Sequence, residues 1–217
     1  LKPQKRRALV DILTFSGDTL DKILGLDLAG SPKRPTGYAF WRDKKLEVGC
    51  VYKDEEILSL AQSFDLIMID APLSLPEGRK DLDTPGPHFR ECDMELRKAG
   101  IKFFPLSLGP MRMLTKRAIF LANLFKKQNK RVFETYPGAF YDSVGISRRD
   151  REAIVRFYRH INLNLETREY LQDELDAVAC WLSGVCYTIG KVRLFAGKDG
   201  QIVLASEECV ELLKYTL

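Results

Sequence analysis

The chain has 217 residues, of which 45% are hydrophobic and 29% are charged, a composition that fits a globular protein and excludes a fibrous or disordered one. Its net charge of +4 is too small to identify a nucleic-acid-binding protein on its own. No apolar run approaches the roughly 20 residues of a membrane-spanning helix, so we expect one domain-sized core and no membrane partner.

The first half of the chain predicts short apolar strands that end at small or polar residues. Four strands are expected, with one short helix between the third and the fourth, at residues 23–28, 36–41, 46–51, 54–63 (the helix) and 64–69. The fourth strand is apolar throughout, which is typical of a central parallel strand that is buried on both faces. A loop rich in Pro and Gly follows at 71–87, and loops of this length inside a domain are usually functional or disordered.

The second half of the chain predicts mainly helices. Four helices and a fifth strand are expected, at residues 87–99, 111–127, 131–135 (the strand), 148–160 and 167–188. Residues 101–108 are apolar but irregular, and they predict no element. A hairpin of 192–196 with 201–204, turning at Asp199-Gly200, and a last helix at 207–215 complete the pattern. Early hairpin strands followed by crossover connections indicate a mixed sheet with helices on both faces.

Carboxylates recur where these elements begin or end. Asp27, Asp70 and Glu134 each lie at or near the end of an apolar strand, and Asp173 and Asp176 share one face of the helix at 167–188 because they are three residues apart. Ionised carboxylates are costly to bury unless they are paired or bound to metal. The pattern therefore predicts a shared cation, and Mg²⁺ or Mn²⁺ is the natural choice because both prefer oxygen ligands.

Each carboxylate also has an ordinary structural interpretation. The strand-end aspartates could be turn residues, and the helix pair could serve the helix dipole or a cap. Glu134 could simply pair with Arg131 or Arg90. These alternatives stay open at the level of sequence.

Basic residues near the carboxylates are candidates for binding a phosphate backbone. Lys33 and Arg34 follow Asp27 by a few residues, where a phosphate would lie if the carboxylates held metal. Arg90 is the third candidate. The other basic clusters of the chain are interpreted as solvated surface.

The cysteines predict neither a zinc site nor a disulfide framework. The five cysteines include no C-x-x-C pair and are accompanied by only two histidines. Cys180 and Cys186 fall inside an apolar helix and are expected to be small buried hydrophobes. With no signal peptide expected in the basic N-terminal segment, a reducing and hence cytoplasmic location is predicted.

Five short motifs, in this order, resemble an uncharacterised family of predicted nucleases, domain-of-unknown-function family 429. They are Gly-Leu-Asp-Leu-Ala-Gly-Ser at 25–31, Ile-Asp-Ala-Pro-Leu at 69–73, the stretch from Gly86 to Gly100 with His88, Arg90 and Asp93, Phe-Glu-Thr-Tyr-Pro at 133–137, and Asp-Glu-Leu-Asp-Ala at 173–177. The resemblance implies an α/β, ribonuclease H-like domain at 23–190, with a mixed five-stranded sheet in the order 3-2-1-4-5. Two segments lie outside the resemblance. Residues 1–22 are expected to form an N-terminal extension, and the hairpin and short helix at 191–217 are expected to pack on the same domain.

The more distant relatives of this family include Holliday-junction resolvases. Their four acids match Asp27, Asp70, Asp173 and Asp176 of this chain, whereas Glu134 has no clear counterpart. We therefore expect a Mg²⁺- or Mn²⁺-dependent hydrolase of nucleic-acid phosphodiesters, acting on DNA or RNA.

In the expected two-metal site, Asp27 would bridge the ions, Asp70 would bind one, and Asp176, with Asp173 beside it, would bind the other. Glu134 would orient the attacking water. The alternatives are a nucleotide-dependent kinase or ATPase of the actin-like superfold and a non-catalytic nucleic-acid-binding module. A homodimer is left open.

Overall fold

The computed structural model describes residues 20–214 and contains a single sheet. Its strands are β1 (Ile23–Asp27), β2 (Thr36–Arg42), β3 (Lys45–Val51), β4 (Leu66–Asp70), β5 (Arg131–Thr135), β6 (Val192–Gly197) and β7 (Gly200–Ala205). A short 3-10 helix, η1 (Leu20–Lys22), precedes β1. The predicted extension at 1–22 lies outside the described residues except for this turn.

Seven α-helices surround the sheet in the described part of the chain. They are α2 (Asp54–Ala61), α3 (Glu91–Lys98), α4 (Gly109–Lys127), α5 (Pro137–Ser143), α6 (Arg151–His160), α7 (Gln172–Thr188) and α8 (Glu207–Leu213).

The sheet contains the predicted strand order but is larger than predicted. Strands β1, β2 and β3 form an antiparallel meander, and β4 and β5 add to β1 in parallel, which gives the expected order 3-2-1-4-5. The prediction of five strands is wrong, because the C-terminal hairpin continues the same sheet beyond β5 in the order β5-β7-β6. Strand β7 pairs in parallel with β5, opposite Glu134, so β5 does not remain an exposed edge.

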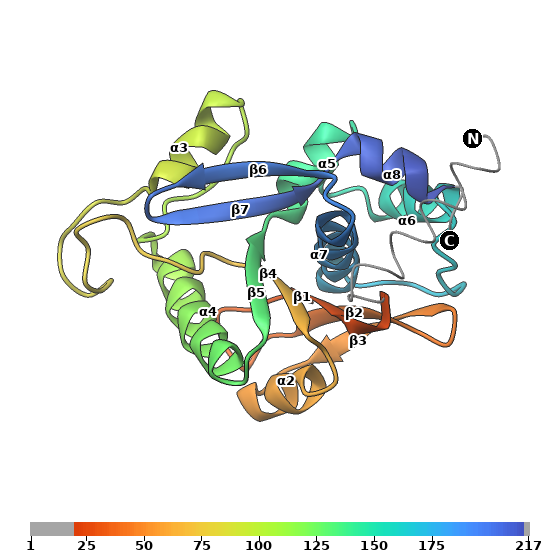
Figure 1. Ribbon diagram of the computed structural model, residues 1–217, viewed down its shortest axis with the longest axis horizontal. Helices are drawn as coiled ribbons and strands as arrows, with labels where there is room; N and C mark the ends of the chain where they lie inside the picture. The colour runs from red at the N-terminus through yellow and green to blue at the C-terminus, as the bar shows by residue number, and fades with distance from the viewer. Residues whose placement is uncertain (1–19, 215–217) are drawn as a thin grey trace.

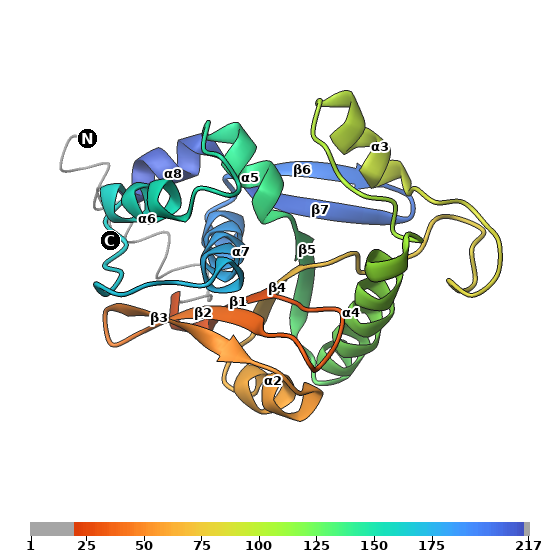
Figure 2. The ribbon, with the colours of Figure 1, turned by 180° about the vertical axis from the view of Figure 1, so that it is seen from behind.

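Helices cover both faces of the sheet (Figure 1). Helix α7 lies on one face, and α2 and α4 lie on the other. The side chains of β1 alternate accordingly, since Ile23 packs in the α7 cluster while Leu24 and Leu26 pack in the α4 cluster. Figure 2 shows α3 and α5 beside the hairpin, where a third apolar cluster joins them. This alternation decides which strand-end carboxylates can meet.

Some boundaries and one helix differ from the prediction. Helix α5 was not predicted, although Pro137 at its first position is a recognised start signal. Helix α7 begins at Gln172 rather than at 167. Leu171, the residue before it, is extended, and its N–H donates a hydrogen bond to the Glu174 carboxylate, which is a capping contact at the start of a helix. Residues 101–108 contain no helix or strand.

The expectation that Cys186 is a free buried thiol is wrong. Cys186 on α7 forms a disulfide with Cys209 on α8, with 5.7 Å between their Cα atoms. Cys180 is a free buried cysteine, as predicted. The cytoplasmic location stays a prediction, and it loses part of its basis because disulfides persist mainly in oxidising compartments.

Candidate active site

Asp27 and Asp70 lie side by side on the α7 face of the sheet. Strands β1 and β4 are parallel, with Leu26 opposite Ile69, so their carboxyl ends meet. Both aspartates fall on the face that alternation assigns to α7, and each is partly buried. The two carboxyls are close enough to shift each other's pKa. The structure therefore brings these two predicted residues together.

Helix α7 brings Asp173 and Asp176 to the same place because two glycines allow it to approach the sheet closely. A Cβ at Gly25 would overlap the carbonyl oxygen of Ala177, and a Cβ at Gly37 would overlap that of Asp173. Gly37 pairs with Asp27 in the register of β1 and β2. The first turns of α7 therefore lie over the end of β1.

The four aspartates act on one another electrostatically. Burial raises the pKa of Asp27 well above its usual value, and the charges of Asp70, Asp176 and Asp173 raise it further. Burial also raises the pKa of Asp70, and the charges of Asp176 and, from the other face of the sheet, Glu134 add to the rise. The pKa of Asp176 rises to about 6, chiefly through burial, although hydrogen bonds from Gln172 and Tyr141 oppose the rise. These residues form a centre of mutually repelling carboxylates.

Cations compensate this centre only weakly. Within residues 20–214, none of the four aspartates forms an ion pair, although Arg148 lies close enough to lower the pKa of Asp70 and Asp176. Arg148 is itself held by Asp142, with 2.5 Å between Nη2 and Oδ2, and it donates to the Tyr136 hydroxyl. The basic run at 148–151 could have pointed to this residue, but it was interpreted as solvated surface.

The donors fit a hard divalent cation in kind. No three His, Cys, Asp or Glu side chains of the described residues are arranged as a ready-made metal cage. Mg²⁺, however, is usually held by one or two carboxylates, with waters and substrate phosphates completing its shell, rather than by an all-protein cage. The adjacent Asp27 and Asp70 carboxyls meet that requirement, and Asp176 is the third oxygen donor nearby.

Glu134 does not belong to this centre. Val132 packs in the α4 cluster, Phe133 packs against Tyr187 of α7 with the two rings tilted, and Glu134 therefore points back to the α4 side. There its carboxylate accepts two hydrogen bonds of 2.6 Å from Arg90 and one of 3.0 Å from the Leu73 N–H. The alternative that Glu134 pairs with Arg90 describes the structure, and the predicted role in orienting water is not supported by this placement.

The predicted phosphate-binding residues separate in the structure. Arg90 is only 1% exposed, and its guanidinium is fully engaged with Glu134, Asp93 and Ser74, so it presents no free donor to a phosphate. Lys33 and Arg34 are exposed in the loop between β1 and β2, next to the end of the strand that carries Asp27. They keep their predicted role as candidates.

A cleft of about 170 Å³ opens beside Asp70. Apolar side chains and the Arg90–Glu134 pair line it. Phe103, Phe104 and Tyr136 line both this cleft and a second one of about 640 Å³. None of these aromatic residues was predicted as functional. The sequence feature that could have pointed to them is the apolar segment at 101–108, which contains Phe103 and Phe104 and predicts no secondary structure.

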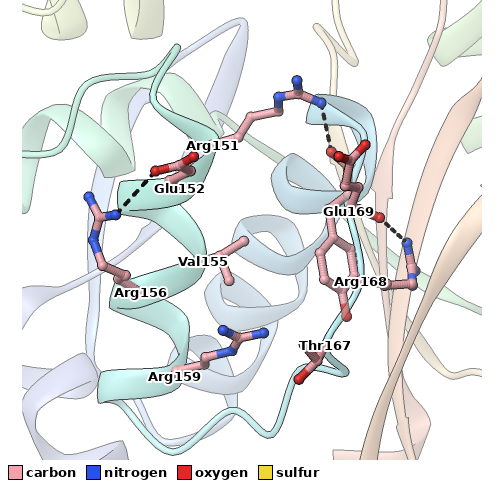
Figure 3. A pocket seen from close by; sticks show the side chains of 9 residues that line it. Arg151, Glu152, Val155, Arg156, Arg159, Thr167, Arg168 and Glu169 are labelled. Atoms are coloured by element: carbon pink, nitrogen blue, oxygen red, sulfur yellow. Dashed lines mark hydrogen bonds and ion pairs between the residues drawn. The ribbon is translucent and has the colours of Figure 1, made fainter.

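A separate arginine-rich cleft of about 580 Å³ lies between α6 and the segment before α7 (Figure 3). None of the predicted site residues lines it. Its arginines already have partners, since Arg151 donates to the Tyr170 carbonyl, Arg159 donates to the Glu166 carbonyl, and Arg156 pairs with Glu152 at 3.5 Å. We call it the reference cleft, because it combines several arginines with none of the candidate catalytic residues.

Comparison with known proteins identifies the family. The model of DUF429, a family described as proteins of unknown function, matches residues 25–200, and the chain therefore belongs to this family. No curated protein matches the sequence. Among the described residues, no helix has the length and apolar character to cross a bilayer.

Proposed function

We propose that this member of the DUF429 family is a metal-dependent hydrolase of nucleic-acid phosphodiesters. The observation that carries the proposal is that the parallel pairing of β1 and β4 places Asp27 and Asp70 at adjacent strand ends on the α7 face, where the close approach of α7 adds Asp176. The charge of Asp176 raises the pKa of both Asp27 and Asp70. Such a group is unfavourable unless protons or a cation neutralise it, and natural proteins retain such costs mainly at functional sites. The strand order β3-β2-β1-β4-β5 supports a ribonuclease H-like assignment.

Each residue of the centre has a distinct part in this proposal. Asp27, whose pKa is raised by both Asp70 and Asp176, would be the ligand that the bound cations share. Asp70 and Asp176 would be the further ligands. A bound Mg²⁺ or Mn²⁺ supplies positive charge that polarises the phosphodiester and lowers the pKa of the attacking water. Lys33 and Arg34 would contact the phosphate backbone that enters past the end of β1.

Arg148 adds a fixed positive charge on one side of the centre. Because it lowers the pKa of Asp70 and Asp176, it favours the ionised carboxylates that a cation requires. Asp142 and the Tyr136 hydroxyl hold its guanidinium in place. Arg148 is therefore a positioning and charge-balancing residue in this proposal.

The test is cleavage of end-labelled oligonucleotides, single-stranded and duplex, with Mn²⁺ or with EDTA. We expect products only with Mn²⁺, and a rate at least about a thousandfold lower for Asp70→Asn, because a cation ligand contributes several kcal/mol of transition-state stabilisation. Asp65→Asn, the same substitution at an exposed position just before β4, is the matched control and should leave the rate unchanged.

Three results would contradict the proposal. An unchanged rate for Asp70→Asn would place the cleavage elsewhere. Hydrolysis of ATP without cleavage of any oligonucleotide would favour the actin-like alternative, and tight oligonucleotide binding without cleavage would favour a non-catalytic binding module.

A further inference from the structure

The two clefts next to the candidate active site form one continuous surface, because they share Phe103, Phe104 and Tyr136. The smaller cleft reaches Asp70. The larger one is lined by four cationic residues, which are Arg97, Lys102, Arg148 and Arg149. We call this surface the basic–aromatic cleft.

Guanidinium groups of this cleft lie against aromatic rings. The Arg97 guanidinium lies 4.4 Å from the centroid of Phe89 and 5.8 Å from that of Phe103, and the Arg148 guanidinium lies 5.1 Å from the centroid of Tyr136. Phe104 is 68% exposed, the most exposed of the large apolar side chains described. A ring this exposed buries little surface against its own protein, and its face is available to stack on a ligand.

This combination matches the chemistry of an unpaired nucleic-acid strand. Cations follow the phosphates, and exposed rings stack on bases, which every base permits because each has a π-face. A base in a duplex is already stacked on its neighbours, so an exposed Phe104 offers nothing to double-stranded DNA or RNA. The reference cleft in Figure 3 also contains four arginines, but Glu152 and Glu169 line it as well, and its one aromatic ring, that of Tyr170, is buried.

We infer that the basic–aromatic cleft binds unpaired nucleotides, with Phe104 as the stacking platform and Arg149 as a phosphate contact. The bound strand then passes Tyr136 and Arg148 on its way to Asp70. Binding of the strand stands on the cleft alone, and only the delivery of a phosphodiester to Asp70 rests on the proposed function.

The first experiment measures binding by fluorescence anisotropy, with a labelled unstructured oligopyrimidine of about 12 nucleotides and its duplex. EDTA is present, so that cleavage does not interfere. We expect the full chain to bind the single strand at least about tenfold more tightly than the duplex. Phe104→Ala should weaken single-strand binding about tenfold, whereas Phe120→Ala, which removes a ring that is 55% exposed and lies outside the cleft, should leave it unchanged.

The second experiment measures how binding depends on salt. Each phosphate contact to a single strand contributes about −0.7 to the slope of log K against log salt concentration. Arg149→Gln should therefore make the slope shallower by about that amount. Arg156→Gln, in the reference cleft, should not change it.

The outcomes separate this inference from the proposed function. Duplex binding as tight as single-strand binding, or a change of less than about twofold for Phe104→Ala, overturns the inference even if Mn²⁺-dependent cleavage is observed. The expected binding with no cleavage supports the inference and contradicts the proposed function. No binding to either oligonucleotide overturns the inference and leaves Phe104 as a surface for a protein partner.

Discussion

Two groups of carboxylates lie at the same edge of the sheet, on opposite faces, and they are neutralised in different ways. On the α4 side, Glu134 and Asp93 surround the buried guanidinium of Arg90, which donates to both carboxylates. On the α7 side, Asp27 and Asp70 lie at adjacent strand ends and shift each other's pKa, and Arg148 lowers the pKa of Asp70 without forming an ion pair with it.

This difference separates structural from functional acids. Burial raises the pKa of Glu134, and Arg90 opposes that rise, so the protein itself provides the counter-charge. For Asp27 and Asp70 the protein provides too little, and the missing positive charge must come from bound protons or a cation. A buried acid at the end of a strand is therefore not sufficient evidence of catalysis. What distinguishes a structural acid from a candidate catalytic one is whether the protein supplies a cationic partner for it.

The largest expected effect is on catalysis by the uncompensated group. Asp176→Asn should lower phosphodiester cleavage by at least about a thousandfold, which corresponds to roughly 4 kcal/mol. Asp173→Asn should cost about tenfold to a hundredfold, because we expect it to act on the outer edge of the site or through a water. Initial rates of both variants at saturating Mn²⁺ settle the order. A nearly normal Asp176→Asn beside an inactive Asp173→Asn would mean that the two roles are exchanged.

The next effect is on stability and should have opposite signs in the two groups. Glu134→Gln removes the main partner of a buried arginine, so we expect it to lower the free energy of unfolding by about 3 kcal/mol. Asp27→Asn removes a repelling charge and should raise the stability of the metal-free protein slightly. Urea denaturation in EDTA measures both. If Asp27→Asn lowered the free energy of unfolding and Glu134→Gln left it unchanged, the assignment of structural and functional acids would be the wrong way round.

A smaller effect should appear in the pH dependence of the metal-free protein. The pKa values of Asp27, Asp70 and Asp176 are raised by folding, that of Asp176 to about 6, so the folded state holds protons that the unfolded state releases. The stability from these protons is fully present below the unfolded pKa of about 4 and is lost as the pH rises through the folded values.

Thermal denaturation in EDTA from pH 4 to pH 7 checks this sign. The melting temperature of the wild type, taken relative to Asp27→Asn, should fall across this window. A difference that is flat or rises with pH would show that these carboxylates do not repel one another as described.

The positions that could be predicted from the sequence are those with a local signal. Asp27 and Asp70 end apolar strands whose parallel pairing follows from the chain order, and the spacing of Asp173 and Asp176 places them on one face of a helix. The face of Glu134 could not be predicted, because Val132 and Phe133 are both apolar and a strand buried on both faces shows no alternation.

Other features depend on contacts that are distant in sequence. The hairpin was predicted, but its pairing with β5 joins Glu134 to Ile202, a contact without a local pattern. The disulfide between Cys186 and Cys209 is of the same kind, since connectivity cannot be deduced from cysteine spacing. Helix α5 has only seven residues, too few to show a helical period.

The most direct test of the metal site is the melting temperature with and without millimolar Mn²⁺, for the wild type and Asp27→Asn. A cation that binds only the folded state stabilises it by about 2.7 kcal/mol at a hundred times its Kd, which for a chain of this size is a rise of about 5–10 °C. We predict this rise for the wild type and none for Asp27→Asn. An unchanged wild type, or an equal rise in the variant, would contradict a metal centre at Asp27 and Asp70.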